Sequence, residues 1–437
     1  MSADRVSGEP LALLFKGMGV LLCLRALKLM LVHIDYYGDT TLLFDFWGFS
    51  WVPKLPPAGG YLVLGVAALS GALMAAARNA RVRQGALWLG IASFGLFFLQ
   101  DKAFYGNLNY ALLCILVSLG LVKAWRSLDE LRVVSATTLL VPRVMVALMY
   151  FYAGVIKLSP DWLSGDVIGL FISSDTPMFA HGLMSHPLVL MSMAVLGALF
   201  DLAIGPLLLW KKSRRFGLIL MTGFHMTNAL TLDVPEVAIS MFLLTILAFA
   251  SPEMARKALR VVSTSHDDSR HDGLSRPGQG VIIAFLIFQC VWPLRPYVLG
   301  ASDSRWTHVS QDFSWWLRST SMTVSIQFYI HVDAQEPYKL DVSRYLDIKE
   351  QKAFAMDPYL VTQFVQHMHE RLKEEHPEAQ EITIKVVSSA SLNRCAEQPW
   401  IREDLDLVHE PLQYDMSHVV HPLRSHTCRA WSGQQER

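Results

Sequence analysis

Long apolar runs alternate with short polar segments over the first 300 residues of the chain. A helix that crosses the hydrocarbon core of a bilayer needs about 20 mainly apolar residues, and nine runs approach or reach this length. They lie near residues 11–34, 61–77, 84–100, 107–122, 137–158, 187–210, 216–232, 236–251 and 280–299. The pattern therefore predicts about nine transmembrane helices, several of them short.

The basic residues of the connecting segments alternate from one loop to the next. The segments 78–83, 123–136, 211–215 and 252–279 hold fifteen lysines and arginines together. The four loops between them hold only Lys54 and Lys102. Cytoplasmic loops collect lysine and arginine, so we expect a cytoplasmic N-terminus. Everything after residue 300 is then extracytoplasmic, in a periplasm, outside the cell or in an organelle lumen.

The last 137 residues have a different pattern. The segments MTVSIQFYIHV (322–332) and EITIKVVSSASL (381–392) are rich in β-branched residues and partly alternate, which is typical of strands. Between them, residues 358–376 have the spacing of an amphipathic helix. We therefore expect two domains, a transmembrane domain over 1–300 and an extracytoplasmic α+β domain over 301–437.

The composition agrees with a membrane protein, because 52% of the residues are apolar and 17% are charged. Lysine plus arginine equals aspartate plus glutamate, at 38 each, and no basic stripe is interleaved with aromatic residues, so we expect no nucleic-acid partner. None of the five cysteines has metal-ligand spacing, and we predict no metal site. Cys395 and Cys428 would pair if the tail faces an oxidising compartment.

One lysine stands out at the outer end of the fifth predicted span. In the stretch YFYAGVIKLSPDWLSG (150–165), Lys157 lies where the apolar run meets a proline and a tryptophan. In one interpretation it snorkels to the interface, and Tyr150, Tyr152 and Trp162 are ordinary interfacial aromatic residues. In the other interpretation Lys157 belongs to a polar site within the bundle.

Further polar residues lie at a similar depth in other spans. They are Arg25 and Lys28 in the first span, Asp101, Lys102 and Asn107 at the junction of the third and fourth, Asp201 in the sixth, and His225 and Asn228 on one face of the seventh. Each ionisable group in hydrocarbon costs roughly 2.5 to 3.5 kcal/mol, so such groups should face the bundle interior and find partners.

Two arrangements of these groups are open. They would line one polar cavity that opens outward, whose cations suit an anionic or carbonyl-bearing ligand and whose walls admit a lipid-soluble one. Alternatively they form separate contacts between helices, in which His225 bonds Asp201 or Asn228 only to satisfy its polar atoms.

The stretch around Lys157 resembles the signature of the vitamin K-dependent γ-glutamyl carboxylases and of the wider horizontally transferred transmembrane (HTTM) family. In that signature a span ends in an aromatic pair, an AG dipeptide, a lysine and a DW dipeptide, and Lys157 matches the lysine regarded as the active-site base. Other segments resemble the family in the same order along the chain. They are 98–110, 199–209, 223–232, 249–257, 305–319 and 386–408.

The resemblance implies a chemistry. In such enzymes a reduced vitamin K reacts with O2 and becomes the epoxide, the strongly basic intermediate removes a γ-proton from a glutamate side chain, and CO2 adds to the carbanion. Burial disfavours the charged form of a lysine, so a neutral amine can deprotonate the hydroquinone. A position at the end of a span serves both substrates, since the quinol enters from lipid and the glutamate arrives from outside.

The sequence also departs from the family pattern. Ala124 and Leu108 stand where histidines are expected, although Asp101, Lys102, Asn107 and Tyr110 match. Family carboxylases are longer, and the first outer loop here lacks the cysteine that would bridge to the lumenal region, which favours a prokaryotic plasma membrane over the endoplasmic reticulum. The resemblance therefore supports quinol oxygenation more strongly than carboxylation.

We expect an integral membrane enzyme of the γ-glutamyl carboxylase type, a lyase-class carboxylase or quinol epoxidase. It would use reduced vitamin K or a menaquinol-type quinol with O2 and CO2, and its partners would be the bilayer, the quinol and a glutamate-containing peptide or protein. The expected site residues are Lys157 as base, Asp201 as orienting or charge-balancing partner, His225, Asn228, Asp101, Lys102, Asn107, Tyr110 and Trp162 in the pocket, and Asn393 and Asp406 near substrate.

Two other classes of function stay open at this stage. A transporter or channel would use the polar cavity as a permeation path, and it would carry charged or broken helices in the cytoplasmic half and an inverted repeat. A membrane receptor or assembly factor would keep only the scaffold and have no catalytic role for Lys157.

Overall fold

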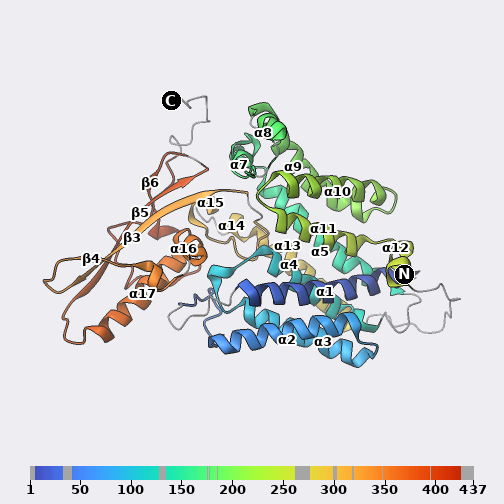
Figure 1. Ribbon diagram of the computed structural model, residues 1–437, viewed down its shortest axis with the longest axis horizontal. Coiled ribbons are helices and arrows are strands. Elements are labelled where there is room, and N and C mark those ends of the chain that lie inside the picture. The colour runs from blue at the N-terminus through green and yellow to red at the C-terminus, as the bar shows by residue number, and fades with distance from the viewer. Residues whose placement is uncertain are drawn as a thin grey trace.

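A bundle of helices with an α+β part at one end makes up the protein (Figure 1). The computed structural model describes residues 5–32, 42–126, 134–174, 176, 178–184, 186–260, 276–298, 303–316, 319–346, 348–393 and 395–424. Asp35, Asp39 and Cys428 lie outside these ranges.

Each of the nine predicted ranges holds a helix whose ends agree within a few residues, except that the last predicted range continues into shorter helices. The long helices are α1 (Glu9–Val32), α2 (Pro57–Ala76), α3 (Ala80–Phe98), α4 (Asn107–Leu121), α5 (Ala136–Ile156), α9 (Pro187–Leu209), α10 (Arg214–Thr231), α11 (Pro235–Phe249) and α13 (Arg276–Val291). Shorter elements connect them: β1 (Arg5–Val6), η1 (Lys102–Phe104), η2 (Ala124–Arg126), β2 (Val134–Ser135), α6 (Pro160–Leu163), α7 (Asp166–Gly169), α8 (Met178–Met184) and α12 (Pro252–Leu259).

Five segments among the described residues are long and apolar enough to cross a membrane. They are Glu9–Leu31, Pro57–Ala76, Ala136–Ile156, Pro187–Leu209 and Pro277–Tyr297, and α11 with α12 makes a sixth if this pair, bent by 105°, counts as one span. Helix α4 is apolar but has 15 residues, and α3 and α10 carry arginines in their first turns. The chain is a multi-pass membrane protein.

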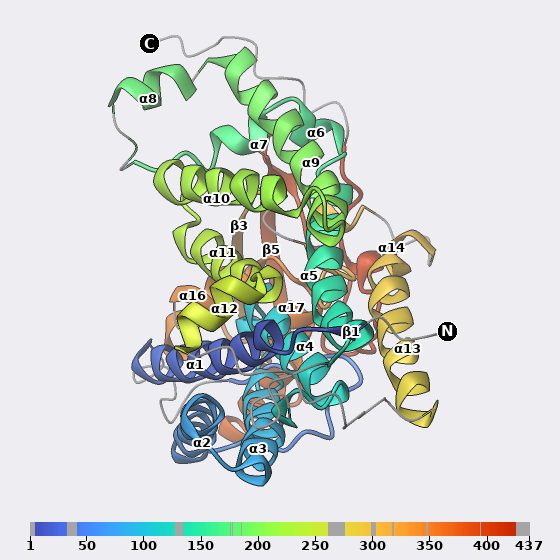
Figure 2. The same ribbon diagram turned by 90° about the vertical axis from the view of Figure 1, so that its right-hand side faces the viewer.

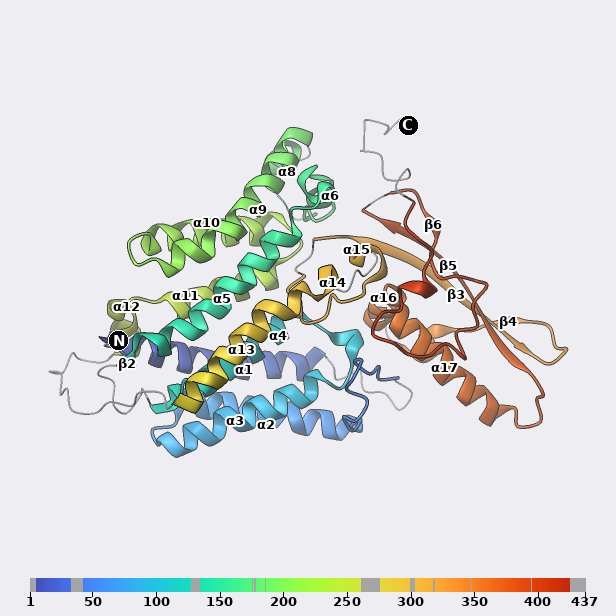
Figure 3. The same ribbon diagram turned by 180° about the vertical axis from the view of Figure 1, so that it is seen from behind.

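The long helices run along the bundle, and the sheet lies beyond one of its ends (Figures 1 and 3). Helices α2 and α3 form one edge of the bundle and α9 and α10 the other, with α1, α4, α5, α11 and α13 between them. Figure 2 looks at the end of the bundle that faces away from the sheet, where the chain begins. The N-terminus and the sheet are therefore at opposite ends of the bundle.

The tail forms the α+β part that its sequence predicts. Strands β3 (Met322–Val332) and β5 (Ile382–Leu392) pair antiparallel over their whole length, from Met322 opposite Leu392 to Val332 opposite Ile382. The remaining elements from residue 292 on are η3 (Trp292–Leu294), α14 (Arg295–Val298), α15 (Ser304–Thr307), β4 (Tyr338–Lys339), η4 (Val342–Arg344), α16 (Ile348–Ala355), α17 (Pro358–Glu375), β6 (Gln398–Pro399) and η5 (Ser417–Val419). The sheet order is β4-β3-β5-β6.

The period-2 pattern of the strands explains how the sheet meets its helices. Every even-numbered residue of β5 is buried, whereas odd-numbered ones are exposed or half-buried. Phe328 of β3 packs against Phe364 of α17, with ring centroids 5.1 Å apart. Apolar side chains that alternate along a strand lie on one face, so this face of the sheet forms a core with α16 and α17.

The two parts of the molecule share residues across their boundary. Phe44, from the loop after α1, is buried in the core of the α+β part, and Trp315, from the segment before β3, is buried in the core of the bundle. The α+β part is thus fastened to the ends of the helices that face the sheet, by apolar packing from both sides.

Candidate functional site

Lys157 follows directly after the last residue of α5 and points to α9. Its Nζ bonds the Oδ2 of Asp201, and the two side chains are 12% and 3% exposed. The close approach of the two helices makes this pair possible: a Cβ at Gly154 would lie 2.9 Å from the backbone nitrogen of Leu202. Small residues let helices in membranes approach closely. The glycine of the AG dipeptide therefore brings Lys157 within reach of Asp201, and Lys157 does not snorkel.

Trp162 covers the pair. Its ring centroid lies 5.1 Å from Lys157 Nζ, in cation–π geometry, and its Nε1 donates to the carbonyl of Ala194 at 3.1 Å. The loop can fold back this tightly because Gly165 has φ of +88° and a Cβ there would meet the backbone of Leu190 at 2.6 Å, so only glycine fits. The loop after α5 encloses the lysine instead of leaving it at the surface.

His225 lies on α10 near the pair. Its Nε2 bonds the hydroxyl of Tyr150 at 2.7 Å, and that hydroxyl also bonds Thr245 Oγ1 at 2.9 Å. The Nδ1 of His225 is buried and has no hydrogen-bond partner among the described residues. One alternative from the sequence had His225 bonded to Asp201 or Asn228; the described bond is to Tyr150, and Asn228 lies half-buried one turn further along α10.

A second group of predicted residues lies where α3 meets α4. Asp101 is buried and its Oδ1 accepts from the backbone nitrogens of Phe44 and Ala103, at 3.1 and 2.9 Å. The amide of Asn107 donates to the carbonyl of Trp316 at 2.6 Å. These two residues therefore hold the loop and the segment before β3 in place.

Lys102 of this group is tied to the α+β part. Its Nζ bonds Asp357 and lies 3.1 Å from Asp312 Oδ2. Burial alone would lower the pKa of Lys102, but the charges and hydrogen bonds of the two carboxylates outweigh it and raise that pKa well above its ordinary value. Lys102 is thus a permanent cation that joins the bundle to the α+β part.

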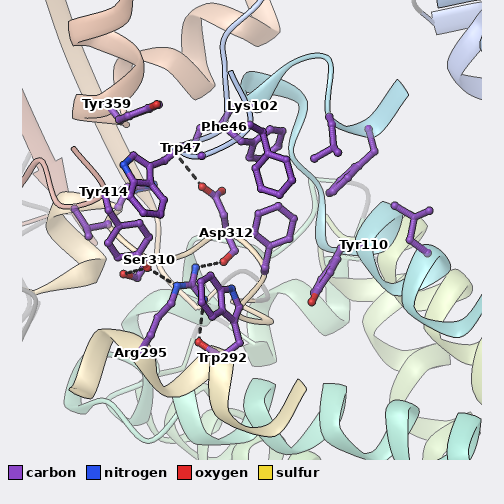
Figure 4. A pocket seen from close by; sticks show the side chains of 18 of the residues that line it. Phe46, Trp47, Lys102, Tyr110, Trp292, Arg295, Ser310, Asp312, Tyr359 and Tyr414 are labelled. Atoms are coloured by element: carbon purple, nitrogen blue, oxygen red, sulfur yellow. Dashed lines mark hydrogen bonds and ion pairs between the residues drawn. The ribbon is translucent and has the colours of Figure 1, made fainter. Parts of the chain in front are cut away.

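Beside Lys102 lies a cavity of about 570 Å³, here called the junction cavity (Figure 4). It is enclosed by the loop 46–49, helices α3, α4 and α13, the segment 308–313 and residues near the start of α17. Its lining is mostly aromatic and aliphatic, and its polar residues are Lys102, Tyr110, Gln289, Arg295, His308, Ser310, Asp312, Asp357, Tyr359 and Tyr414. Tyr110 bonds Gln289 Oε1 at 3.0 Å and stacks on Trp315, with centroids 4.6 Å apart.

The predicted pocket residues therefore fall into two groups. The lining of the junction cavity includes Lys102 and Tyr110 but, among the described residues, none of Lys157, Trp162 and Asp201. Helix α13 connects the groups, because Tyr152 of α5 donates to the carbonyl of Cys290 and the neighbouring Gln289 lines the cavity. The sequence left open either one polar cavity or separate contacts between helices, and the described contacts divide these residues between two places.

The two residues that were expected in the tail differ in their positions. Asn393 follows β5 and its amide lies 3.2 Å from Asp161 Oδ2, in the loop directly after Lys157. Arg305 also bonds Asp161, at 2.9 Å. Asp406 instead lies in an exposed loop, where its carboxylate bonds His409 at 2.7 Å. Asn393 is thus brought to the Lys157 loop, and Asp406 is not linked to it by any contact among the described residues.

Sequence reasoning singled out none of Asp312, Asp357, Arg295 and His308. Asp312, Asp357 and His308 lie in polar or mixed segments of the chain, where a polar side chain does not stand out. For Asp312 and His308 the only signal was the family-like segment 305–319 that contains them. Tyr150 and Thr245 were also missed as partners of His225, because a tyrosine and a threonine in apolar spans are common.

The two departures from the family pattern lie at different ends of α4. Ala124 is fully buried in η2, after the inner end of the helix, and α4 is about 22 Å long at 1.5 Å per residue for its 15 residues. Leu108 lies in the first turn at the outer end. A histidine at position 124 would therefore lie far from Lys157, and only position 108 is on the side of the candidate site.

Cys395 is disulfide-bonded, and its predicted partner Cys428 lies outside the described residues.

Comparison with protein-family models gives two matches that divide the chain. Residues 6–253 match the HTTM domain, and residues 275–426 match the lumenal domain of vitamin K-dependent gamma-carboxylase. Neither the curated proteins nor the solved structures that were compared with the chain gave a match. The HTTM match covers more than half of the chain and carries the Lys157 loop, and the second match covers the α+β part. The chain therefore belongs to the HTTM family, in the branch that carries the lumenal domain of the vitamin K-dependent gamma-carboxylases.

Proposed function

We propose that the protein is a membrane enzyme of the vitamin K-dependent carboxylase type, in which Lys157 is the base that starts quinol oxygenation. The observation that carries this proposal is the buried pair of Lys157 and Asp201 under Trp162, with the unpartnered Nδ1 of His225 nearby. Ionisable groups and polar atoms that converge in a buried site are typical of acid–base chemistry.

The site fits a quinol by its chemistry. Buried polar atoms in proteins almost always have a hydrogen-bond partner, so the free Nδ1 of His225 is suited to a ligand hydroxyl or carbonyl. The aromatic rings of Tyr150, Phe200 and Phe224 pack around His225. A bound reduced vitamin K or menaquinol-type quinol would be the group that reacts with O2. Carboxylation of glutamate by CO2 would come after that reaction.

The lysine–aspartate pair can present an uncharged amine without exchanging a proton with water. The pair shares one proton at rest. When Asp201 holds this proton, the amine of Lys157 is neutral and can accept the hydroxyl proton of the quinol, after which the pair holds two protons. Trp162 covers the pair, and in the low dielectric of the site this proton sharing competes with the separated charges.

We also propose the membrane orientation that the loop charges predict, with the N-terminus in the cytoplasm, nine spans and the α+β part outside. It is supported by the fifteen basic residues in alternate loops and by the N-terminus and the sheet being at opposite ends of the bundle. In this orientation the boundary between the transmembrane domain and the extracytoplasmic domain lies near residue 300. A glutamate-containing peptide would then approach from the α+β side, where Asp161 meets Asn393 and Arg305.

The test measures both half-reactions in the reconstituted full chain. Reduced menaquinone or vitamin K is supplied with O2 and CO2, with and without a glutamyl peptide, and the epoxide and the carboxylated peptide are quantified. Epoxide without carboxylated peptide would leave quinol oxygenation as the function. Lys157→Ala should lower epoxide formation by about 10²- to 10⁴-fold, the usual contribution of a general base.

The matched control is Lys28→Ala, which removes another outer lysine that is paired with one carboxylate, Glu236, at 2.6 Å, but is half exposed. This variant should keep its turnover. Folded wild-type protein that forms neither product would contradict the proposal and favour a receptor or a transporter.

A further inference from the structure

The junction cavity has a polar outer end and an apolar inner end. Lys102, His308, Asp312 and Asp357 gather at the outer end, beside the α+β part. Leu113 and Val117 line it from α4, and Val117 lies seven residues beyond Tyr110, the first lining residue of this helix, or about 10 Å deeper along it. This is about a third of a hydrocarbon core of about 30 Å. The cavity is therefore long enough to take an apolar chain that lies along the helices.

The inner part of the cavity borders the lipid-facing side of α13. Phe285 and Phe288 line the cavity, and Phe288 is 47% exposed. The cavity volume of about 570 Å³ lies within the range of small-molecule sites. A ligand can thus reach the cavity from the bilayer, past α13.

The charges at the outer end cancel. Lys102 and Arg295 supply two cations, and Asp312 and Asp357 supply two anions. Arg295 makes four hydrogen bonds: it donates to the hydroxyl of Tyr414, to the carbonyls of Asp312 and Trp292, and to Ser314 Oγ, the last at 2.6 Å. Lys102 is held by its two carboxylates. Neither cation is therefore left to attract an anionic ligand.

The wall beside these charges is built from strained backbone. His308, Ser310, Phe313 and Trp315 have φ of 56°, 66°, 56° and 59°, in the left-handed region that non-glycine residues avoid. Such conformations cost free energy and persist where the surroundings fix them, often at functional sites. Here His308, Ser310 and Phe313 of the strained segment line the cavity.

His308 supplies the polar atom that lacks a partner. Its Nε2 is buried and makes no hydrogen bond with any described residue. Burial lowers the pKa of His308 to about 4, while Asp357 raises it and Lys102 lowers it further to smaller extents. The imidazole is therefore neutral at pH 7, and its free nitrogen can make one hydrogen bond to a hydroxyl or a carbonyl.

We propose that the junction cavity is a second binding site, separate from the Lys157 site, for a neutral amphipathic lipid. Its hydroxyl or carbonyl head bonds Nε2 of His308, and its apolar chain lies between α4 and α13. The quinol of the proposed reaction and other neutral lipids share this chemistry. The inference does not rest on the function of Lys157, because its evidence is the shape, charge balance and free nitrogen of the cavity.

The test uses photoreactive probes on the full chain in lipid nanodiscs. One probe is hexadecanol with a diazirine in its chain, the other is a menaquinone with a diazirine in its tail, and the labelled residues are found by mass spectrometry. We expect labelling on α4 and α13 around Leu113, Val117 and Phe288. Unlabelled hexadecanol or menaquinone should compete, whereas hexadecanoate should not. Labelling by the menaquinone probe alone assigns the cavity to quinones, and labelling by both assigns it to neutral lipids in general.

Two variants test the cavity in different ways. His308→Gly removes the free nitrogen and relieves the left-handed backbone, so the protein stays folded and the probe should bind about 3- to 10-fold more weakly, as for one lost hydrogen bond. Val117→Trp fills the inner part and should abolish labelling of α4. His418→Ala, at an exposed histidine bonded to Glu410, and Lys157→Ala should leave the labelling unchanged.

Equal competition by hexadecanoate would overturn the proposal that the head group of the ligand is neutral. Labelling confined to other helices, or unchanged binding in both cavity variants, would overturn the site itself. Loss of labelling in Lys157→Ala would show that the two sites are one. The readout is binding, so a failure of the proposed reaction leaves this result interpretable.

Discussion

Lys157 and Lys102 both lie next to the outer end of a helix, with side chains 12% and 9% exposed, and both have an aromatic ring about 5 Å from the ammonium. A histidine near each has a buried ring nitrogen without a partner among the described residues, Nδ1 of His225 and Nε2 of His308. The carboxylates differ. Lys157 has one, from the neighbouring helix α9, whereas Lys102 has two, both from the α+β part.

This difference separates Lys102, which has a structural role, from Lys157, for which we propose a reactive one. Two carboxylates hold Lys102 in its charged form and tie two parts of the molecule together. One carboxylate faces Lys157, and under the proposed function this pair holds a single proton. Burial and an aromatic cover are common to both lysines, and the number of carboxylate partners is the difference between them.

The largest effect is expected when Lys102 is replaced. Lys102→Ala leaves Asp312 and Asp357 buried and without their cation, and breaking a buried ion pair in this way costs about 3 to 5 kcal/mol. Thermal melting curves of the protein in detergent should show this loss of stability. Limited proteolysis should release the α+β part first. A variant as stable as the wild type would mean that the ion cluster does not join the two parts.

Asp201→Asn should have the next largest effect, on turnover. Asparagine cannot take up the proton that Asp201 shares with Lys157, so the pair loses the proposed state in which the amine is neutral, and we expect epoxide formation to fall by about 10²-fold. Glu236→Gln is the matched control, because Glu236 pairs with Lys28 at 2.6 Å at an exposed position, and its turnover should be unchanged. Equal losses of turnover in both variants would mean that any lost negative charge lowers turnover, and that Asp201 has no specific role.

The smallest effect concerns pH. The pKa of His308 is about 4 in the folded protein and about 6.5 in an unfolded chain, so the unfolded chain binds more protons between these values. The free energy of unfolding should therefore decrease as the pH is lowered through this window, by about 1 to 2 kcal/mol from pH 7 to pH 5.

His308→Asn isolates that contribution, because asparagine tolerates the left-handed backbone and does not titrate here. Melting curves of wild type and variant at pH 7 and pH 5 give the difference. The same dependence in both proteins would assign the change to other groups.

The positions of the helices and strands could be predicted because each is fixed by local physics. Hydrocarbon requires long apolar helices, so the nine ranges held helices. Period-2 alternation placed the strands 322–332 and 381–392 within one residue. The length of a span was harder to predict, since α3 and α10 are too polar, and α4 too short, to meet the criterion of an isolated span.

The sequence by itself determined a multi-pass helical membrane protein with an α+β tail and singled out Lys157 through its motif. Asp201 was expected as a partner of Lys157, but only the tertiary structure decided the contact between them, and it alone decided the partners of Lys102. Asp201 is 44 residues from Lys157, and Asp357 is 255 residues from Lys102. The physical reason is that an ion pair forms where packing brings two distant segments together, and that packing depends on close contacts such as Gly154 against Leu202, which no local pattern of polar and apolar residues encodes.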